Sequence, residues 1–253
     1  MKKTWKTFVV FAMLLALAAL TAASAQAEGM TRIQLGTEES GEDGSWETTE
    51  NGIRITKPGE YLISGTLEQG QILVDCTETG KVTLYLDGVT VHNAQGPAVR
   101  IGECSPRAVI SLVDKSVNTL SNGTDLILDS GDEPDGVIYS RSDLTVTGNG
   151  SLEVRAGALN GIVSKDDLKI QGGDIRIQAP NHGIKGKDAV EISGGNIVVE
   201  AGRDGVKATN KNDADRGYIE ITGGELTVSC GDDAISYVTF CSITGGKIHL
   251  SSK

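Results

Sequence analysis

The chain has 253 residues, a formal net charge of −11, 33 glycines, 5 prolines and only 4% aromatic residues. A hydrophobic content of 38% is too high for a disordered chain, and the glycines follow no three-residue period, which excludes collagen. The acidic balance argues against nucleic acid as a partner, because neutralising phosphates requires clustered Lys and Arg.

The N-terminal segment, residues 1–27, has the pattern of a signal peptide. Lysines at its start precede an apolar run over residues 8–20, and Ala25-Gln26-Ala27 is a typical cleavage site. The run is short for a membrane span, which needs about 20 apolar residues. We therefore expect a secreted protein with no membrane contact after cleavage; a retained anchor is the alternative.

The next segment, residues 28–50, is polar and is expected to form a leader or an N-terminal cap. From residue 51 to residue 253 the sequence consists of short alternating apolar runs, which are typical of strands with one buried face. In the first half these runs lie at residues 53–55, 61–63, 72–74, 82–86, 89–91 and 108–112.

The second half of the chain is repetitive. A double glycine follows an alternating run at Gly172-Gly173, Gly194-Gly195, Gly223-Gly224 and Gly245-Gly246. The spacings are 22, 29 and 22 residues, and the longer one contains a seven-residue insertion near residues 208–217. A second marker, a polar residue followed by Gly or Ala and an apolar residue, recurs at Asn160, His182, Asp204 and Asp233. The sequence alone favours a surface turn position for His182.

A 22-residue unit of short strands predicts a parallel β-helix. One unit cannot bury its apolar face alone, whereas stacked units pair strand on strand at about 4.8 Å per coil. Glycines then form the corners, and a narrow core of Ile, Val, Leu and Ala leaves little room for aromatic rings. We expect an all-β solenoid over residues 51–253; an antiparallel sandwich is the alternative. The pattern stops in mid-coil, so an open or truncated last coil and end-to-end self-association are expected.

Several motifs, in order, resemble those of one family. The run Ile55-Thr56-Lys57-Pro58-Gly59-Glu60-Tyr61-Leu62-Ile63-Ser64-Gly65-Thr66-Leu67 looks like its opening signature, and residues 81–90 look like its next coil. Later coils are matched at His182-Gly183-Ile184-Lys185-Gly186, at residues 192–195, at Asp204-Gly205-Val206-Lys207-Ala208 and at Gly231-Asp232-Asp233-Ala234-Ile235-Ser236. The chain resembles secreted bacterial carbohydrate-binding proteins with a polysaccharide-lyase-like right-handed β-helix, of the cellulose- and pectin-binding type. The resemblance implies polysaccharide binding, commonly with calcium, outside a bacterial cell or on its surface.

One column of the repeat contains two lysines among its four residues. Three residues after the polar residue of the second marker, the column reads Val163, Lys185, Lys207 and Ser236. The resemblance implies acidic or amide side chains at the last three positions, so the lysines depart from a calcium-binding pattern. We expect stacking to form a cationic ladder that matches the carboxylates of an acidic glycan such as polygalacturonate. The predicted ligand-binding residues are Lys165, Lys185, Lys187, Arg203 and Lys207. A solvated turn with alternating charges is the alternative.

Oxygen-bearing side chains cluster in and around the insertion. Calcium takes six to eight oxygen ligands from carboxylates, amides and carbonyls. The predicted calcium ligands are Asp204, Asn210, Asn212, Asp213, Asp215, Asp232 and Asp233. A second acidic loop at residues 129–135 is a weaker candidate, and a solvated polar loop is the alternative.

An enzymatic reading is also open. β-Elimination on a uronate requires a base, and Lys185 or Lys207 near Asp204 and Asp233 could supply the parts of a pectate-lyase-like site. No catalytic signature is recognisable, so we favour a secreted, calcium-supported polysaccharide-binding protein with acidic glycans preferred over cellulose. A β-eliminating lyase and a structural surface or coat solenoid are the alternatives.

The four cysteines divide into two pairs. Cys230 and Cys241 fall in columns of small apolar residues and are expected to face the core. Cys76 and Cys104 each follow a strand, in loops that would stack in consecutive coils, so a disulfide between them is predicted for a secreted chain. The aromatic residues are scattered, which disfavours a flat aromatic row for crystalline cellulose.

Overall fold

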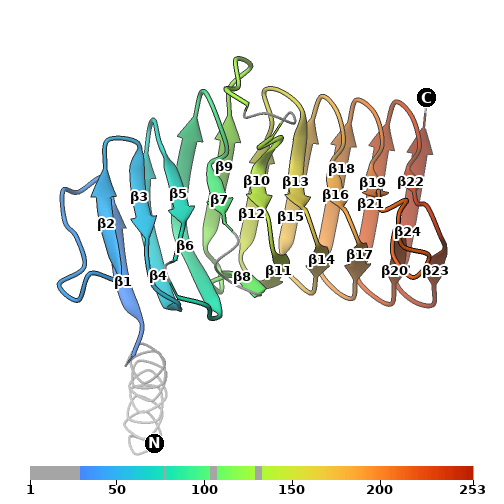
Figure 1. Cartoon of the computed structure of the whole chain (residues 1–253). Coiled ribbons are helices and arrows are strands. Elements are labelled where there is room, and N and C mark those ends of the chain that lie inside the picture. Colours follow the sequence, from blue (N-terminus) through green and yellow to red (C-terminus); the bar gives the residue numbers. More distant parts are fainter. Residues whose placement is uncertain (1–28, 77, 103–106, 129–132, 253) are drawn as a thin grey trace, which may run out of the picture.

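The computed structural model describes residues 29–252, except for residue 77 and residues 103–106 and 129–132. The predicted signal peptide lies outside the described residues. All the regular elements in the described part are β-strands, and they stack side by side from the N-terminal to the C-terminal end (Figure 1). The prediction of an all-β fold with long parallel sheets is therefore confirmed.

One sheet has nine strands, all paired in parallel except for the first two. Its strands are β2 (Trp46–Thr49), β3 (Gly52–Ile55), β5 (Gln71–Val74), β7 (Val99–Ile101), β10 (Gly136–Ser140), β13 (Asn160–Ser164), β16 (Ile184–Gly186), β19 (Val206–Ala208) and β22 (Ile235–Ser236).

The second sheet has fifteen strands in two limbs that meet at β6 (Val82–Asn93), and β6 also pairs with β4 (Gly59–Leu67), which pairs with β1 (Thr31–Leu35). The first limb contains β8 (Arg107–Leu112), β11 (Asp143–Gly148), β14 (Asp167–Ile170), β17 (Ala189–Ile192), β20 (Tyr218–Ile221) and β23 (Cys241–Ile243). The second limb contains β9 (Val117–Asn122), β12 (Ser151–Arg155), β15 (Asp174–Ala179), β18 (Asn196–Ala201), β21 (Glu225–Cys230) and β24 (Lys247–Ser252). Each regular coil places one strand in each limb and one in the nine-stranded sheet.

Strand register reproduces the sequence repeat. Leu168 pairs with Val190, Val190 with Ile219 and Ile219 with Cys241, so the 22- and 29-residue spacings are single coils. The corner between the limbs carries the double glycines. Gly195 has φ +92°, and a Cβ on Gly194 would lie 2.5 Å from the Gln171 carbonyl oxygen. The corner is therefore restricted to glycine by both backbone conformation and close contact.

The core is a column of aliphatic side chains, and most of its Ile, Val and Leu residues are fully buried. The segment expected to be a leader or cap contributes β1 and β2 to the two sheets. Ile33, Leu35 and Trp46 from this segment join the core. At the other end Ile243 and Leu250 are about half exposed, with exposed fractions of 50% and 46%. Among the described residues, no helix is long and apolar enough to cross a membrane.

Candidate functional site

The nine-stranded sheet carries the predicted lysine column on its outer side. Lys185 on β16 and Lys207 on β19 are register partners in adjacent coils, and both are about one-quarter exposed. Each has its own carboxylate: Lys185 Nζ lies 2.6 Å from Asp135 Oδ2, and Lys207 Nζ lies 2.5 Å from Asp204 Oδ2. The structure brings the two lysines together but pairs each one within the chain.

The remaining predicted cations lie at the corners of the same sheet. Lys165 forms an ion pair with Glu133, and Arg203 Nε lies 2.9 Å from Asp232 Oδ2. Lys187 is exposed and forms no ion pair with another described residue. This region, from Lys165 to Lys207 with the acids that pair with it, is called the charged face below.

Glu133 and Asp135 come from the segment that precedes β10 and reach over the sheet. The Tyr139 hydroxyl donates a hydrogen bond to Glu133, and Asn160 Nδ2 donates to Asp135 Oδ2 at 2.8 Å. Burial tends to raise the pKa of Glu133, but hydrogen bonds from Lys165 and Tyr139 outweigh it, so the pKa lies below its ordinary value. The fold therefore holds Glu133 in its ionised form.

A polar ladder runs through the corner that leads into the nine-stranded sheet. Asn160 Oδ1 accepts the backbone N–H of His182, His182 Nδ1 accepts that of Asp204, and Asp204 Oδ1 accepts that of Asp233, at 3.1, 3.3 and 3.1 Å. Each side chain thus satisfies a main-chain donor of the next coil. The sequence markers located this column, but the hydrogen-bonding role of its side chains was not predicted.

His182 is buried, with only 6% of its surface exposed, so the expectation of a surface turn position is wrong. Burial, followed by the positive charge of Lys207, lowers the pKa of His182 to about 4. A neutral imidazole is also what the ladder requires, because Nδ1 can accept a hydrogen bond only when it carries no proton. His182 is a structural member of the ladder.

The residues predicted to bind calcium use their oxygens inside the fold. Asp204 accepts hydrogen bonds from Lys207 and from the Asp233 backbone, and Asn210 Oδ1 accepts the backbone N–H groups of Asn212 and Asp213. Asp213 Oδ1 accepts the Asp215 N–H, and Asp232 pairs with Arg203. In the part of the chain that the structure describes, no three His, Cys, Asp or Glu side chains are grouped to hold a metal ion. Calcium also takes amide and main-chain oxygens, so calcium binding by the predicted set stays a prediction.

The predicted disulfide includes Cys104, which lies outside the described residues. Cys230 is buried and pairs in register with Ala201, and Cys241 pairs in register with Ile219. Both carry free thiols, in agreement with the core-facing positions predicted for them.

The sequence profile of the carbohydrate-binding domain-containing proteins matches residues 49–253. The chain belongs to this family. A carbohydrate-binding domain-containing protein of Acetivibrio thermocellus is 39% identical over 133 residues, which is 52% of this chain and 46% of that protein. The chain thus spans about half the length of this relative.

A solved structure supports the same family and fold. The polysaccharide lyase-like protein from C. thermocellum, solved as a gadolinium derivative, has a TM-score of 0.77 and 34% sequence identity to this chain. The similarity covers 89% of this chain and 96% of that one. The polysaccharide-lyase-like architecture therefore extends over most of the chain.

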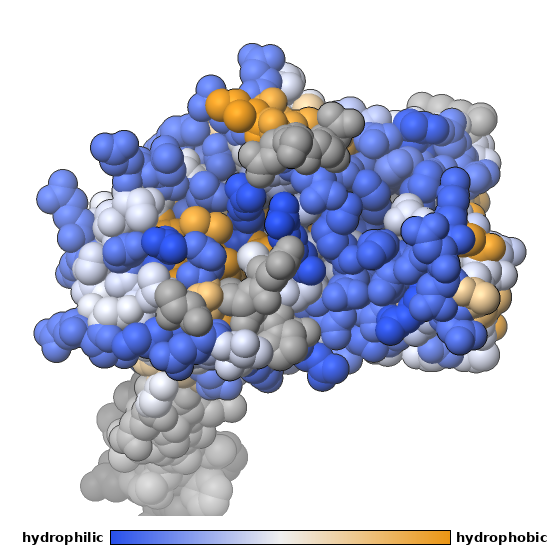
Figure 2. All heavy atoms as spheres, viewed as in Figure 1, coloured by the Kyte–Doolittle hydropathy of each residue, from blue (hydrophilic) through white to orange (hydrophobic). Residues whose placement is uncertain are grey.

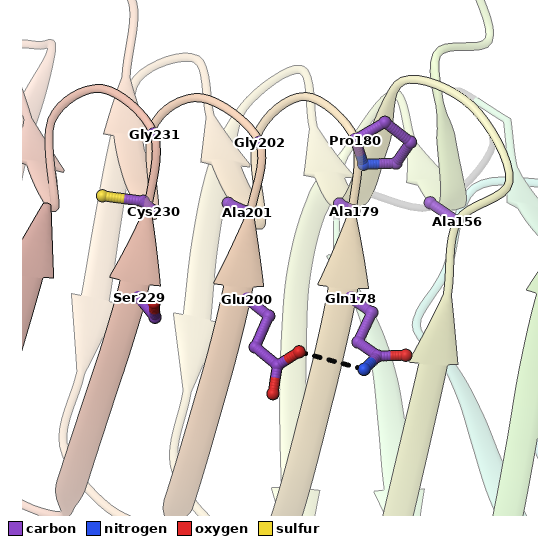
Figure 3. Close-up of a pocket in the computed structure, with 10 residues that line it drawn as sticks. All are labelled: Ala156, Gln178, Ala179, Pro180, Glu200, Ala201, Gly202, Ser229, Cys230 and Gly231. Carbon is purple, nitrogen blue, oxygen red and sulfur yellow. Dashed lines mark hydrogen bonds between the residues drawn. The ribbon is translucent and has the colours of Figure 1, made fainter. Parts of the chain in front are cut away.

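A shallow groove of the carbohydrate-binding domain crosses the ends of successive strands in the second limb (Figure 3). Its volume is about 590 Å³, and small side chains of four adjacent coils leave it open. These are Ala156, Ala179, Ala201 and Cys230. On its polar side, Gln178 Nε2 donates to Glu200 Oε2 at 3.0 Å. Sequence analysis did not identify this groove, although the column of small residues was visible.

The surface seen in Figure 2 is mostly hydrophilic over the C-terminal coils, with hydrophobic atoms at the end of the stack. Tyr237 and Phe240 are about half exposed there, and the Phe240 ring stacks on Tyr218 with centroids 4.9 Å apart. These rings lie at one corner of the last coils rather than in a row along a sheet, as the scattered aromatics indicated.

Proposed function

We propose that this chain is a secreted polysaccharide-binding protein whose coils form a right-handed parallel β-helix, and that it prefers acidic glycans. Family membership supports carbohydrate binding. The observation that carries the preference is the in-register stacking of Lys185 on Lys207. The strands that carry these two lysines are neighbours, at the usual spacing of about 4.8 Å, and a column of cations suits a polymer that carries a carboxylate on each sugar.

The ion pairs of the charged face do not prevent this role. Each lysine is partly exposed and carries several N–H donors, of which the internal carboxylate uses one. A glycan carboxylate can therefore bind a remaining N–H donor of each ammonium without displacing the internal carboxylate. Lys187, which is exposed and forms no ion pair with another described residue, adds a positive charge beside the column.

The test is electrophoresis of the mature protein in gels that contain polygalacturonate or its neutral methyl ester. We expect retardation by polygalacturonate only, and a Lys185→Gln/Lys207→Gln variant with about tenfold weaker affinity, which corresponds to about 1.4 kcal/mol. Lys247→Gln is the matched control, because its ammonium also pairs with a glutamate, at 2.7 Å, but on the second limb. Equal retardation of all three proteins would contradict the proposed face.

Two additions to the assay address calcium and catalysis. We propose that calcium supports binding as a bridge between protein and glycan carboxylates, in which case a chelator weakens retardation without unfolding the protein. A lyase would produce unsaturated sugars that absorb in the ultraviolet. The two lysines that could act as bases are ion-paired, and an ammonium has no lone pair with which to take a proton. Retardation without unsaturated product supports binding. The absence of both retardation and product would support a structural solenoid.

A further inference from the structure

A second groove, on the first limb of the fifteen-stranded sheet, collects cations from three separate coils. It has a volume of about 440 Å³. The described residues that line it are Lys81, Arg107, Val109, Thr145, Thr147, Lys169 and Gln171. This set is called the basic groove below. The sequence analysis predicted a binding role for none of these residues, and none of them belongs to the charged face.

The lining is basic without an acid. Lys81, Arg107 and Lys169 supply three positive charges, and no carboxylate is among the described lining residues, although the whole chain has a net charge of −11. Among the described residues, acids flank the groove: Lys169 Nζ is 2.7 Å from Glu191 Oε2, and Asp143 is the register partner of Arg107. Positive charge gathered in one place on an acidic protein creates a local potential that attracts anions.

The uncharged residues suit a sugar polymer. Val109, Thr145 and Lys169 are register partners in three successive coils, so the groove runs along the stack rather than across it. Val109 and Thr145 are nearly buried, with 9% and 7% of their surface exposed. Thr147 and Gln171 add a hydroxyl and an amide, which can exchange hydrogen bonds with sugar hydroxyls.

We propose that the basic groove is a binding site for anionic groups, carboxylate or sulfate, carried by a polysaccharide. The inference rests on the proposed polysaccharide-binding function and adds a second binding surface on a different sheet. Lys81 and Arg107 bind the anion at one end of the groove and Lys169 at the other. Thr145, Thr147 and Gln171 contact the sugar between them.

The test is lysine footprinting of the whole mature protein, in which brief acetylation is followed by mass spectrometry with and without polymer. With polygalacturonate at ten times its Kd, we expect acetylation of Lys81 and Lys169 to slow by about tenfold, because about nine-tenths of the grooves are then occupied. The acetylation rate of Lys247, which lies on the second limb, measures any protection that is not specific to the basic groove. A Lys81→Gln/Lys169→Gln variant is expected to bind polygalacturonate about three- to tenfold more weakly than the wild type.

Parallel arms identify the anion. Protection by polygalacturonate but not by its methyl ester assigns a carboxylate, and protection by dextran sulfate but not by dextran assigns a sulfate. Absence of protection at Lys81 and Lys169 with both anionic polymers overturns the basic groove, as does equal protection by the neutral polymers. Because the same spectra report Lys185 and Lys207, protection at only those two overturns the groove alone. Protection at only Lys81 and Lys169 supports the groove and overturns the charged face.

Discussion

The charged face and the basic groove both present lysines on the outside of a parallel sheet, but the acids beside them differ. On the charged face, Lys207 pairs with Asp204, which is 4% exposed and also belongs to the polar ladder. Beside the groove, Lys169 pairs with Glu191, whose side chain is 26% exposed. The Asp204 carboxylate is therefore part of the fold, whereas the Glu191 carboxylate contributes little to it, and the lysines of both regions stay about one-quarter exposed. Stability measurements should therefore separate the two regions before any glycan is added.

The largest loss of stability is expected for Asp204→Ala. This change leaves Lys207 without its carboxylate and the backbone N–H of Asp233 without its acceptor, so we expect the free energy of unfolding to fall by about 3 kcal/mol. Urea denaturation measures it. Asp204→Asn is the matched control because an amide oxygen can still accept the N–H, as Asn160 does in the ladder. If alanine costs no more than asparagine, the ladder does not contribute as described.

A slightly smaller loss of stability is expected when the pH is lowered, because His182 binds a proton more readily in the unfolded chain. Its pKa is about 4 in the folded chain against an ordinary value of 6.5, so the unfolded chain binds a proton first as the pH falls. Stability is fully present above pH 6.5 and decreases between pH 6.5 and 4, by on the order of 2–3 kcal/mol. His182→Asn keeps an acceptor for the Asp204 N–H and removes the titration, so its stability should change much less over this range. If the free energy of unfolding of the variant falls with pH as steeply as that of the wild type, another group is responsible for the titration.

The regular part of this molecule was predictable because stacking converts sequence period into register. The double glycines and the marker column placed Leu168 beside Val190 and Asn160 beside His182. Contacts that depend on the irregular segments were not predictable. Asp135 reaches Lys185 from fifty positions earlier in the sequence, through a segment that follows no repeat, and no periodicity indicates that contact.

Burial of polar side chains was the second limit. Period-two alternation separates core from surface along a strand, but the ladder lies at a corner, where a polar side chain can turn inward to meet a main-chain donor. His182 and Asp204 are therefore buried at positions that sequence reasoning assigned to solvent or to a metal. The basic groove was missed for a related reason. Lys81, Arg107 and Lys169 share no marker and converge only because their coils stack.

Glycan affinity should respond to the acid beside the groove. Glu191→Gln removes the negative charge next to Lys169. It retains a side-chain oxygen that can accept the hydrogen bond from the Tyr218 hydroxyl, whose oxygen lies 2.9 Å from Glu191 Oε1 in the wild type. We expect polygalacturonate to bind about threefold more tightly, because a lost repulsion at a partly exposed site contributes less than about 1 kcal/mol. Gel retardation at low ionic strength measures this. At high salt the gain should disappear, because exposed charges are screened.

The smallest effect concerns stability and is the sharpest contrast with Asp204. Lys169→Gln and Lys247→Gln each break a lysine–glutamate contact of 2.7 Å between adjacent coils, one in the basic groove and one on the second limb. Both pairs are solvent-accessible, with side-chain exposures of 26% and 26% in the first and 65% and 43% in the second. Each change should therefore lower the free energy of unfolding by less than about 1 kcal/mol, with the more exposed pair near zero.

Urea denaturation at low and at high salt tests this last expectation, since screening should remove most of whatever contribution remains. A loss at Lys169 as large as that at Asp204 would mean that the Lys169–Glu191 pair, like the Asp204 carboxylate, is needed by the fold. A small loss in stability combined with a clear loss of polygalacturonate binding would mean that Lys169 serves the ligand rather than the fold. In an acidic solenoid, a lysine that the fold can spare but the ligand cannot is direct evidence for a binding surface.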